Sequence, residues 1–371
     1  MTSASCLLSP VSKTMNNRLN ALRAKFDNAG IDALYVSNIV NVRYLTGFTG
    51  STAMLFVTRD NAHVYVDSRY WLQAESQVTG AEVVRCGVTV ANEALEAAAA
   101  LPFDRLGYEA GNLTVSALDK LIAKLPTKQL VKTDGLVENL RLVKDASEVA
   151  AVQEACALTD ALFTEILGFI KPGVREVDIA MELEYRMRKR GAQEVGFASI
   201  IASGANGAKP HAGASDKTVE TGDFVTLDFG ARLNGYNSDI TRTVGVGAVS
   251  DEQRSVYDVV LKAQEAAVAA LRPGITCVNA DKVARDIITE AGYGEHFGHG
   301  LGHSLGLDVH DGARLSPVVD PELVVQAGEI WTIEPGIYIP GWCGVRIEDD
   351  VLVTTDGPVV LTHAPKQLLM L

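Results

Sequence analysis

The sequence predicts an α+β protein of two domains: a smaller α/β domain at the N-terminus and a larger C-terminal domain made of two similar halves. Three observations predict this fold class. The chain has 371 residues, helical and strand patterns are mixed up to about residue 142, and a pattern of two helices followed by two strands occurs twice after it. Apolar residues make up 47% of the chain and charged residues 21%, so each domain can bury a core.

The N-terminal part begins with residues 1–14, which are polar and without periodicity and predict a disordered tail. A domain is expected over residues 15–142. Its first elements, in chain order, are a helix over 16–30, a strand over 33–37, a hairpin over 53–58 and 62–67, and a helix over 68–77. Asp145 and Glu148 have the spacing of a capping box that opens a long helix. The C-terminal domain is therefore expected over residues 143–371.

The C-terminal part contains a weak internal repeat. In each copy a Pro-Gly dipeptide separates two helices, and a glycine ends the second helix. Equivalent residues of the two copies are 101 positions apart: Pro172 and Pro273, Gly173 and Gly274, and Gly191 and Gly292. Apolar, β-branched segments over 224–245 and 330–354 follow the two helix pairs. The repeat predicts a pseudo-twofold domain with a central sheet, helices outside and a site lined by both halves. A chance match is the alternative, since Pro-Gly is common between helices.

The charge balance disfavours several classes of partner. With 33 Lys and Arg against 46 Asp and Glu, the net charge is −13, which disfavours nucleic acid and anionic membranes as partners. No stretch approaches the ~18 apolar residues of a membrane span, and no signal peptide is evident. The five cysteines are far apart and form no C-x-x-C pair, so we expect reduced thiols and a cytoplasmic protein.

Four carboxylates lie on the predicted strands of the two halves: Asp228, Asp239, Glu334 and Glu348. A four-residue loop over 232–235 would place Asp228 directly opposite Asp239. Burying bare carboxylates costs several kcal/mol each, and two divalent cations would cancel the charge. The alternative is a structural ion-pair network with Lys209, Arg242 and Arg346.

The histidines are concentrated in one part of the sequence. Five of the seven fall between residues 211 and 310: His211, His296, His299, His303 and His310. Three of them lie in the Gly-rich segment 298–310, where glycine disfavours a helix and lets the backbone approach a ligand. This arrangement favours a role at a site over the alternative of buried core histidines. An oxygen-rich, sulfur-free ligand set favours a hard ion such as manganese, with cobalt or zinc as substitutes.

The motifs together resemble a known family, the pita-bread metallopeptidases that act on Xaa-Pro bonds, namely aminopeptidase P and prolidase. The segments that carry the resemblance are 226–230, 235–243, 298–311, 332–338 and 344–349, with 41–51 and 67–73 resembling the creatinase-type N-terminal domain of these enzymes. The resemblance implies a pita-bread C-terminal domain, a peptide substrate with proline at the second position, and a homodimer. A peptide-binding module without activity and a metal-free creatinase-like hydrolase are the alternatives; both are disfavoured because such relatives typically lose several metal ligands.

The resemblance also implies roles for particular residues. The ligands of two divalent metal ions, most simply Mn²⁺, would be Asp228, Asp239, His303, Glu334 and Glu348. Glu334 would also shuttle a proton for a metal-bound hydroxide. His211 and His310 would contact the substrate, stabilise the tetrahedral intermediate or relay protons. Arg346 would orient the acids, with a plain charge partner as the alternative.

Four residues are candidates for substrate recognition. His299 and Tyr338 are expected to form walls of the proline pocket, with core packing as the alternative. A dipeptidase needs a cation for the carboxylate of the product proline, and the candidates are Arg314 and Arg43. The segment 67–73 resembles aminopeptidase P more closely, so the sequence favours a Xaa-Pro aminopeptidase, with prolidase as the alternative.

Overall fold

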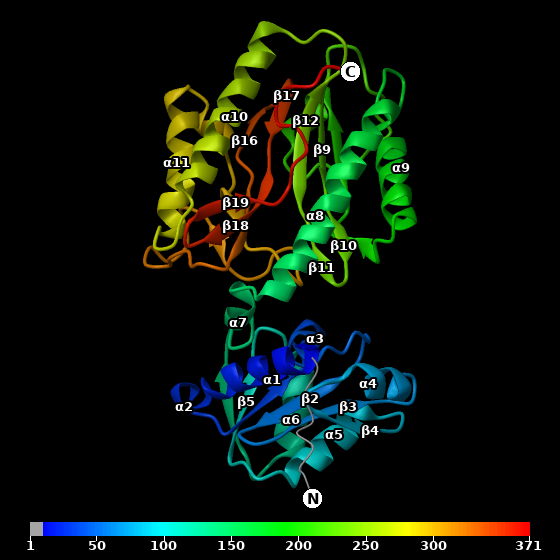
Figure 1. Cartoon of the computed structure of the whole chain (residues 1–371), viewed down its shortest axis with the longest axis vertical. Helices are drawn as coiled ribbons and strands as arrows, with labels where there is room; N and C mark the ends of the chain where they lie inside the picture. Colours follow the sequence, from blue (N-terminus) through cyan, green and yellow to red (C-terminus); the bar gives the residue numbers. More distant parts are fainter. Residues whose placement is uncertain (1–9) are drawn as a thin grey trace, which may run out of the picture. The chain divides into compact units, whose positions relative to one another are not determined.

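The computed structural model describes residues 10–371, which divide into two compact units between Arg141 and Leu142 (Figure 1). The sequence placed this division one residue later. Of the expected tail, residues 1–9 lie outside the described residues, whereas residues 10–14 belong to helix α1 (Pro10–Arg23). The helix begins earlier than expected because proline is favourable in the first turn, where its missing N–H is not needed.

The N-terminal unit is built on a mixed sheet whose strand order is β4-β3-β2-β1-β5-β6. Strand β1 is central, is buried along its whole length, and pairs antiparallel with β2 and parallel with β5. The predicted first strand and the hairpin of β2 with β3 are confirmed. The strands are β1 (Ala33–Val36), β2 (Met54–Thr58), β3 (Ala62–Val66), β4 (Glu82–Arg85), β5 (Arg105–Glu109) and β6 (Gln129–Thr133).

Helices cover both faces of this sheet, with α1 and α3 on one face and α5 and α6 on the other (Figure 1). The single helix predicted over 16–30 is divided at residues 24–25, and Gly30 ends its second part with a left-handed φ of 67°. The remaining helices are α2 (Phe26–Ala29), α3 (Ile39–Thr46), α4 (Trp71–Gln77), α5 (Val90–Ala99), α6 (Val115–Lys124) and α7 (Glu138–Leu142).

The C-terminal unit contains two helix pairs that flank its strands (Figure 1): α8 (Ala146–Ile166) with α9 (Glu176–Lys189), and α10 (Asp251–Ala270) with α11 (Cys277–Glu290). The predicted capping box of α8 is present, because the Asp145 carboxylate accepts the Glu148 N–H and the Glu148 carboxylate accepts the Asp145 N–H. Helices α9 and α11 have 14 residues each and lie 101 residues apart at both ends. The internal repeat is therefore present in the structure.

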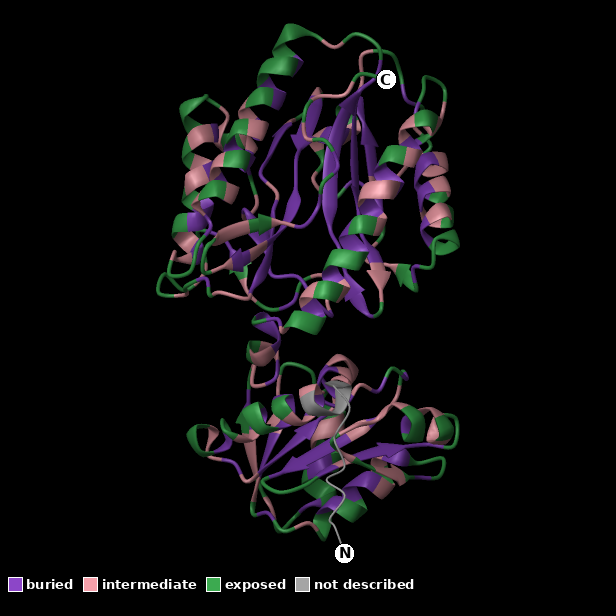
Figure 2. Ribbon diagram, viewed as in Figure 1, coloured by how far each residue is buried: buried purple, intermediate pink, exposed green. Residues whose placement is uncertain are grey.

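The strands between the helix pairs are almost entirely buried (Figure 2). In the first half β9 (Phe224–Phe229) pairs with β12 (Ile240–Gly245), and in the second half β15 (Ile330–Ile333) pairs with β18 (Asp349–Thr354). Two apolar clusters join most of these strands to the helices of their own half, and Phe224 of β9 belongs to the cluster of the second half. The other strands are β7 (Glu194–Val195), β8 (Ile200–Ser203), β10 (Ala231–Leu233), β11 (Tyr236–Asn237), β13 (Gly302–His303), β14 (Arg314–Leu315), β16 (Gly336–Ile339), β17 (Cys343–Arg346) and β19 (Gly357–Val360).

The predicted register of the first hairpin is wrong by two residues. Leu233 pairs with Tyr236, so the loop has two residues, Asn234 and Gly235, with φ of 50° and 82°. Positive φ at both positions is the requirement of a type I′ turn, which Asn-Gly favours. Asp228 consequently lies opposite Thr241 and not opposite Asp239. Because side chains alternate with a period of two, Asp239 still shares the face of Asp228.

Two further observations concern the described part of the chain. No helix within residues 10–371 is long and apolar enough to cross a membrane. Four of the cysteines are buried free thiols, namely Cys86, Cys156, Cys277 and Cys343, and Cys6 lies outside the described residues.

Candidate metal centre and active site

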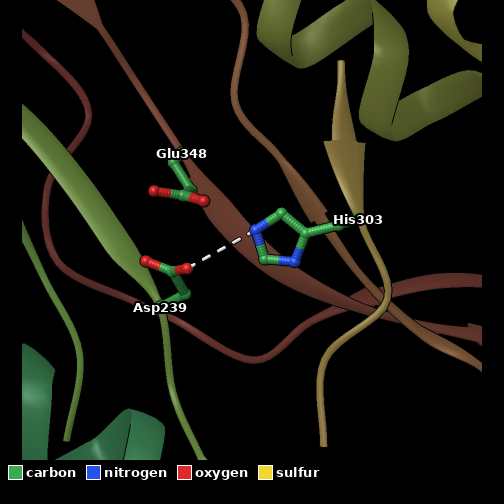
Figure 3. A group of neighbouring side chains, drawn as sticks. All are labelled: Asp239, His303 and Glu348. Atoms are coloured by element: carbon green, nitrogen blue, oxygen red, sulfur yellow. Dashed lines mark ion pairs between the residues drawn. The ribbon is translucent and has the colours of Figure 1, made fainter. Parts of the chain in front are cut away.

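Three buried side chains from both halves of the C-terminal unit converge in the structure: Asp239, His303 and Glu348 (Figure 3). One ligand atom from each lies within 4.8 Å of the others. Asp239 directly precedes β12, Glu348 directly precedes β18, and His303 ends β13. The equivalent ends of the two strand pairs therefore meet, as the repeat predicts, and the Gly-rich segment supplies the imidazole.

The carboxylate of Asp239 lies buried beside other carboxylates. Its side chain is buried, and its Oδ1 has no hydrogen-bond partner among residues 10–371. Burial and the neighbouring Glu348 and Asp228 carboxylates raise the pKa of Asp239 well above its usual range. A buried acceptor without a donor is costly, so a bound cation would satisfy this oxygen.

His303 presents a neutral imidazole to the acids. Its Nδ1 lies 3.2 Å from the Ser304 carbonyl oxygen, to which a protonated Nδ1 donates. Its Nε2 then carries the lone pair, and it lies 3.7 Å from Asp239 Oδ2 and 3.6 Å from Glu334 Oε1. Burial and the adjacent His310 lower the pKa of His303 to about 3. A neutral imidazole oriented by a backbone carbonyl is the form that ligates metals.

Glu334 and Glu348 face each other across the second hairpin. Ile333 pairs with Asp349 and Gly336 pairs with Arg346, so the same register on both sides puts Glu334 opposite Glu348. The Thr241 hydroxyl donates to Glu348 Oε2 at 2.6 Å. Burial raises the pKa of Glu334 to about 8, and burial together with the Glu334 carboxylate raises the pKa of Glu348 well above its usual range.

Asp228, on β9, is the one acid of the four with a basic partner. Arg346 Nη2 donates to Asp228 Oδ2, and Arg346 Nε donates to the Thr241 hydroxyl oxygen at 3.1 Å. The other cations of the predicted ion-pair network lie elsewhere: Arg242 pairs with Asp349 at 2.7 Å, and the exposed Lys209 donates to Asn206. Arg346 can offset one of four carboxylates, so a purely structural ion-pair network does not account for this site.

The donor set fits divalent metal ions. Four carboxylates and one neutral imidazole surround a space in which a single arginine supplies positive charge. Oxygen donors with one nitrogen suit hard divalent cations, and two such ions would balance the charge of the acids. The residues that would hold them are Asp228, Asp239, His303, Glu334 and Glu348.

Two cavities meet at the acids. The larger, of about 450 Å³, has apolar walls that include Phe197, Ile200 and Val309. The smaller, of about 210 Å³, is lined by polar groups that include His299, Arg314 and Arg346. Both cavities share the side chains His211, Asp228, His303, His310 and Glu334. A substrate that occupies both cavities would therefore pass next to the acids, with an apolar group in the larger cavity and a polar group in the smaller one.

The predicted catalytic histidines and Arg314 lie at this junction. His211 and His310 are exposed, and the ring of His310 packs edge-on against that of His303 with 4.2 Å between centroids. Partial burial of the imidazole and the Arg314 cation lower the pKa of His310. Arg314, on β14, is exposed, and within residues 10–371 its guanidinium has no hydrogen-bond or ion-pair partner. It is available to an anionic group in the smaller cavity.

The other predicted substrate-binding residues differ in their positions. His299 lines the smaller cavity, and its Nε2 lies 2.8 Å from the Tyr338 hydroxyl. Tyr338 lines neither cavity; its hydroxyl accepts a hydrogen bond from Arg346 Nη1 at 2.8 Å. Arg43 lies on α3 of the N-terminal unit and also lines neither cavity. Direct contact of Tyr338 or Arg43 with a substrate stays a prediction.

Sequence reasoning missed two residues that support the acids. Thr241 joins Glu348 to Arg346 through its hydroxyl, and its place two residues after Asp239 on one strand was the signal that could have revealed it. Asp350 Oδ2 accepts the Asp239 N–H at 2.9 Å and the Cys156 thiol at 3.2 Å. Burial raises the pKa of Asp350 to about 8.

A duplicated α+β domain that gathers buried carboxylates and one imidazole beside a substrate-sized cavity defines a metal-dependent hydrolase. Comparison with known families agrees: residues 150–355 match the model of metallopeptidase family M24, and residues 18–143 match the Creatinase/Prolidase N-terminal domain. The chain belongs to metallopeptidase family M24. The predicted pita-bread fold and the prediction of a peptidase that uses divalent metal ions are confirmed.

Individual relatives cover nearly the whole chain. A solved structure named Xaa-Pro dipeptidase from Bacillus anthracis is 43% identical, with a TM-score of 0.93 over 96% of this chain and 100% of that chain. A protein named Xaa-Pro dipeptidase from Pyrococcus furiosus is 38% identical over 96% of this chain and 100% of its own length. The structure of an X-Pro aminopeptidase from Thermotoga maritima is 37% identical, with a TM-score of 0.86 over 92% of this chain and 98% of that chain.

Proposed function

We propose that the chain is a Xaa-Pro dipeptidase, a prolidase that hydrolyses the bond before a C-terminal proline. The observation that carries the proposal is Arg314, a cation in the smaller cavity without a partner among the described residues. A dipeptide has its free carboxylate one residue beyond the scissile bond, where an arginine can bind it with two parallel hydrogen bonds. Two relatives named Xaa-Pro dipeptidase, from Pyrococcus furiosus and Bacillus anthracis, support the same choice. The sequence analysis favoured aminopeptidase P, and these observations favour its alternative.

The metal centre of this proposal is dinuclear. Asp228, Asp239, His303, Glu334 and Glu348 would hold two divalent ions, and the oxygen-rich donor set favours manganese, with cobalt or zinc as substitutes. Bound ions would polarise the scissile carbonyl and lower the pKa of a water molecule.

The chain's own residues have separate tasks in this scheme. Glu334, whose side chain is 18% exposed, reaches the junction of the cavities and can accept and return a proton. His211 and His310 line both cavities, so each imidazole can donate to the substrate carbonyl or the departing amine. Arg346 holds Asp228 and keeps it oriented toward the other acids. Proline lacks an N–H, so shape can select it.

A peptide panel tests the proposal. The protein with added Mn²⁺ is assayed on a Xaa-Pro dipeptide and on the matching Xaa-Pro-Yaa tripeptide, before and after chelation. We expect turnover of the dipeptide, little turnover of the tripeptide, and loss of activity with the chelator. Arg314→Ala should raise KM for the dipeptide by roughly 10-fold to 100-fold, because a charge-assisted contact with the carboxylate is lost.

Arg314→Lys is the matched variant, since it keeps the charge but cannot form two parallel hydrogen bonds. Its KM for the dipeptide should lie between those of the wild type and Arg314→Ala. Equal turnover of dipeptides and tripeptides would favour the aminopeptidase alternative. No turnover despite two bound metal ions would favour a peptide-binding module. The expected homodimer and cytoplasmic location stay predictions, which sedimentation and cell fractionation can test.

A further inference from the structure

A buried carboxylate outside both cavities holds the loop that carries His211. Glu176 is the first residue of α9 and is fully buried. Its Oε1 accepts the Ser203 N–H at 2.6 Å and the Ser203 hydroxyl at 2.8 Å. Its Oε2 accepts the Ser215 hydroxyl at 2.6 Å and the Ser215 N–H at 3.2 Å. The Asn206 amide donates to both oxygens.

These donors mark the two ends of one loop. Ser203 ends β8, and Ser215 lies beside the first turn of α9, where the Val177 N–H donates to the Ser215 carbonyl at 3.0 Å. Residues 204–214 lie between the two serines and include His211, which lines both cavities. One carboxylate therefore closes the base of this loop by bonding to both of its ends.

The loop also touches the second half of the unit. Gly207 and Gly344 of β17 approach so closely that a Cβ on Gly344 would collide with the Gly207 carbonyl oxygen. Strand β17 carries Arg346, which bonds to Asp228. The loop is thus fixed to the first half by Glu176 at its base and packed on the second half at Gly207.

The contacts of the carboxylate explain why it is tolerated there. A buried anion is stable only when its lone pairs are satisfied, and here the donors come from Ser203, Asn206 and Ser215. Lys217 adds a second layer, since its Nζ donates to the Ser203 hydroxyl oxygen at 2.9 Å and to Asp223 at 2.7 Å. Loss of the carboxylate would leave the donors at both ends of the loop without their acceptor.

We propose that Glu176 is a positioning residue that sets His211 at the junction of the two cavities by holding both ends of loop 204–214. The effect on catalysis rests on the proposed function, because it assumes that His211 assists peptide hydrolysis. The proposal that Glu176 holds loop 204–214 in a fixed conformation does not depend on that function.

The first test is a double-mutant cycle in the metal-loaded enzyme. Glu176→Gln keeps the size of the side chain but replaces one acceptor oxygen by a donor, and we expect kcat/KM to fall about 10-fold to 100-fold with the metal content unchanged. In a His211→Ala background the same change should have less than about a twofold effect, since its target is already gone.

Asp281→Asn is the matched control. Asp281 is a buried acid on α11 that accepts the Leu301 N–H at 2.9 Å and pairs with Arg285, so it supports a different loop. Any change that Asp281→Asn makes to kcat/KM should be the same in the wild type and in the His211→Ala background, because it does not act through His211. An undiminished effect of Glu176→Gln in that background would overturn the proposal.

The second test needs no activity. Hydrogen exchange should be faster in residues 204–214 of Glu176→Gln than in the wild type, and unchanged in this loop in Asp281→Asn. Should Glu176→Gln fold poorly, Ser215→Ala removes one donor and should show a smaller change in the same segment. Unchanged exchange in 204–214 in a folded variant would overturn the proposal. Failure of the wild type to cleave Xaa-Pro peptides would instead count against the proposed function.

Discussion

The two halves of the C-terminal unit follow the same plan but place their acids differently. Helices α9 and α11 match in length, and each half has one acid within one residue of the end of its first strand and one directly before its second strand. These acids are Asp228 and Asp239 in the first half, and Glu334 and Glu348 in the second. The duplication therefore explains why four carboxylates meet. A single half could not form the site, because each supplies only two.

The difference between the halves begins at their turns. The first hairpin closes with the two-residue turn Asn234-Gly235, and the second pairs Ile339 with Cys343 across a three-residue loop. Glu334 consequently faces Glu348 directly, whereas Asp228 faces Thr241. The place opposite Asp228 is thus free for a hydroxyl, which bonds to Glu348 of the other half. The imidazole of His303, which ends β13, comes from the second half alone.

Removal of one acid from each half should have the largest effect. Asp239→Asn and Glu348→Gln each remove a charged ligand from the three-residue cluster, so both should lose bound metal and lower kcat/KM by about 10³-fold or more. Elemental analysis measures the bound metal, and turnover of a Xaa-Pro dipeptide measures kcat/KM. Asp286→Asn changes an exposed acid on α11 and serves as the control. Full metal content in either variant would show that the altered carboxylate is not needed as a ligand.

Loss of the link between the halves should have a smaller effect. Thr241→Val keeps the shape of the side chain but removes the hydroxyl that joins Glu348 to Arg346. Residues that orient metal ligands typically contribute 10-fold to 100-fold to metal affinity or activity, and we expect a loss of about that size in metal affinity, measured by titration. Thr226→Val removes a buried hydroxyl that bonds to Thr243 on the same strand pair. An equal loss in Thr226→Val would mean that strand packing, and not the link, is responsible.

The sequence predicted the composition of the site better than its register. The four acids were found because alternation along a strand depends only on local spacing, so an error of two residues kept Asp228 and Asp239 on one face. The predicted pairing is wrong because turn length decides register, and Asn234-Gly235 forms a two-residue type I′ turn in place of a four-residue loop.

The supporting residues could not be predicted in the same way. The Thr241 hydroxyl bonds to Glu348, which is 107 residues away in the chain, and Glu176 bonds to Ser215, which is 39 residues away. The place of Thr241 two residues after Asp239 shows that it shares the face of the acids, but nothing in the sequence shows that its hydroxyl bonds to Glu348. The contact of Glu176 with Ser215 leaves neither a periodic pattern nor a motif. Helix boundaries with a local cause, such as the capping box at Asp145, were predicted correctly.

The smallest expected effect is at the two turns. Gly235 and Gly341 have φ of 82° and 75°, so an alanine at either position adopts a strained left-handed conformation that costs about 1 kcal/mol of stability. We expect Gly235→Ala and Gly341→Ala to lower the free energy of unfolding by similar amounts and to leave kcat/KM within about twofold, because pairing along the whole of β9 with β12 holds the acids in register. Urea unfolding and dipeptide turnover measure both quantities. A much larger loss of activity in Gly235→Ala than in Gly341→Ala would mean that the two-residue turn itself holds the Asp228 and Asp239 register, and that the asymmetry between the halves depends on that single turn.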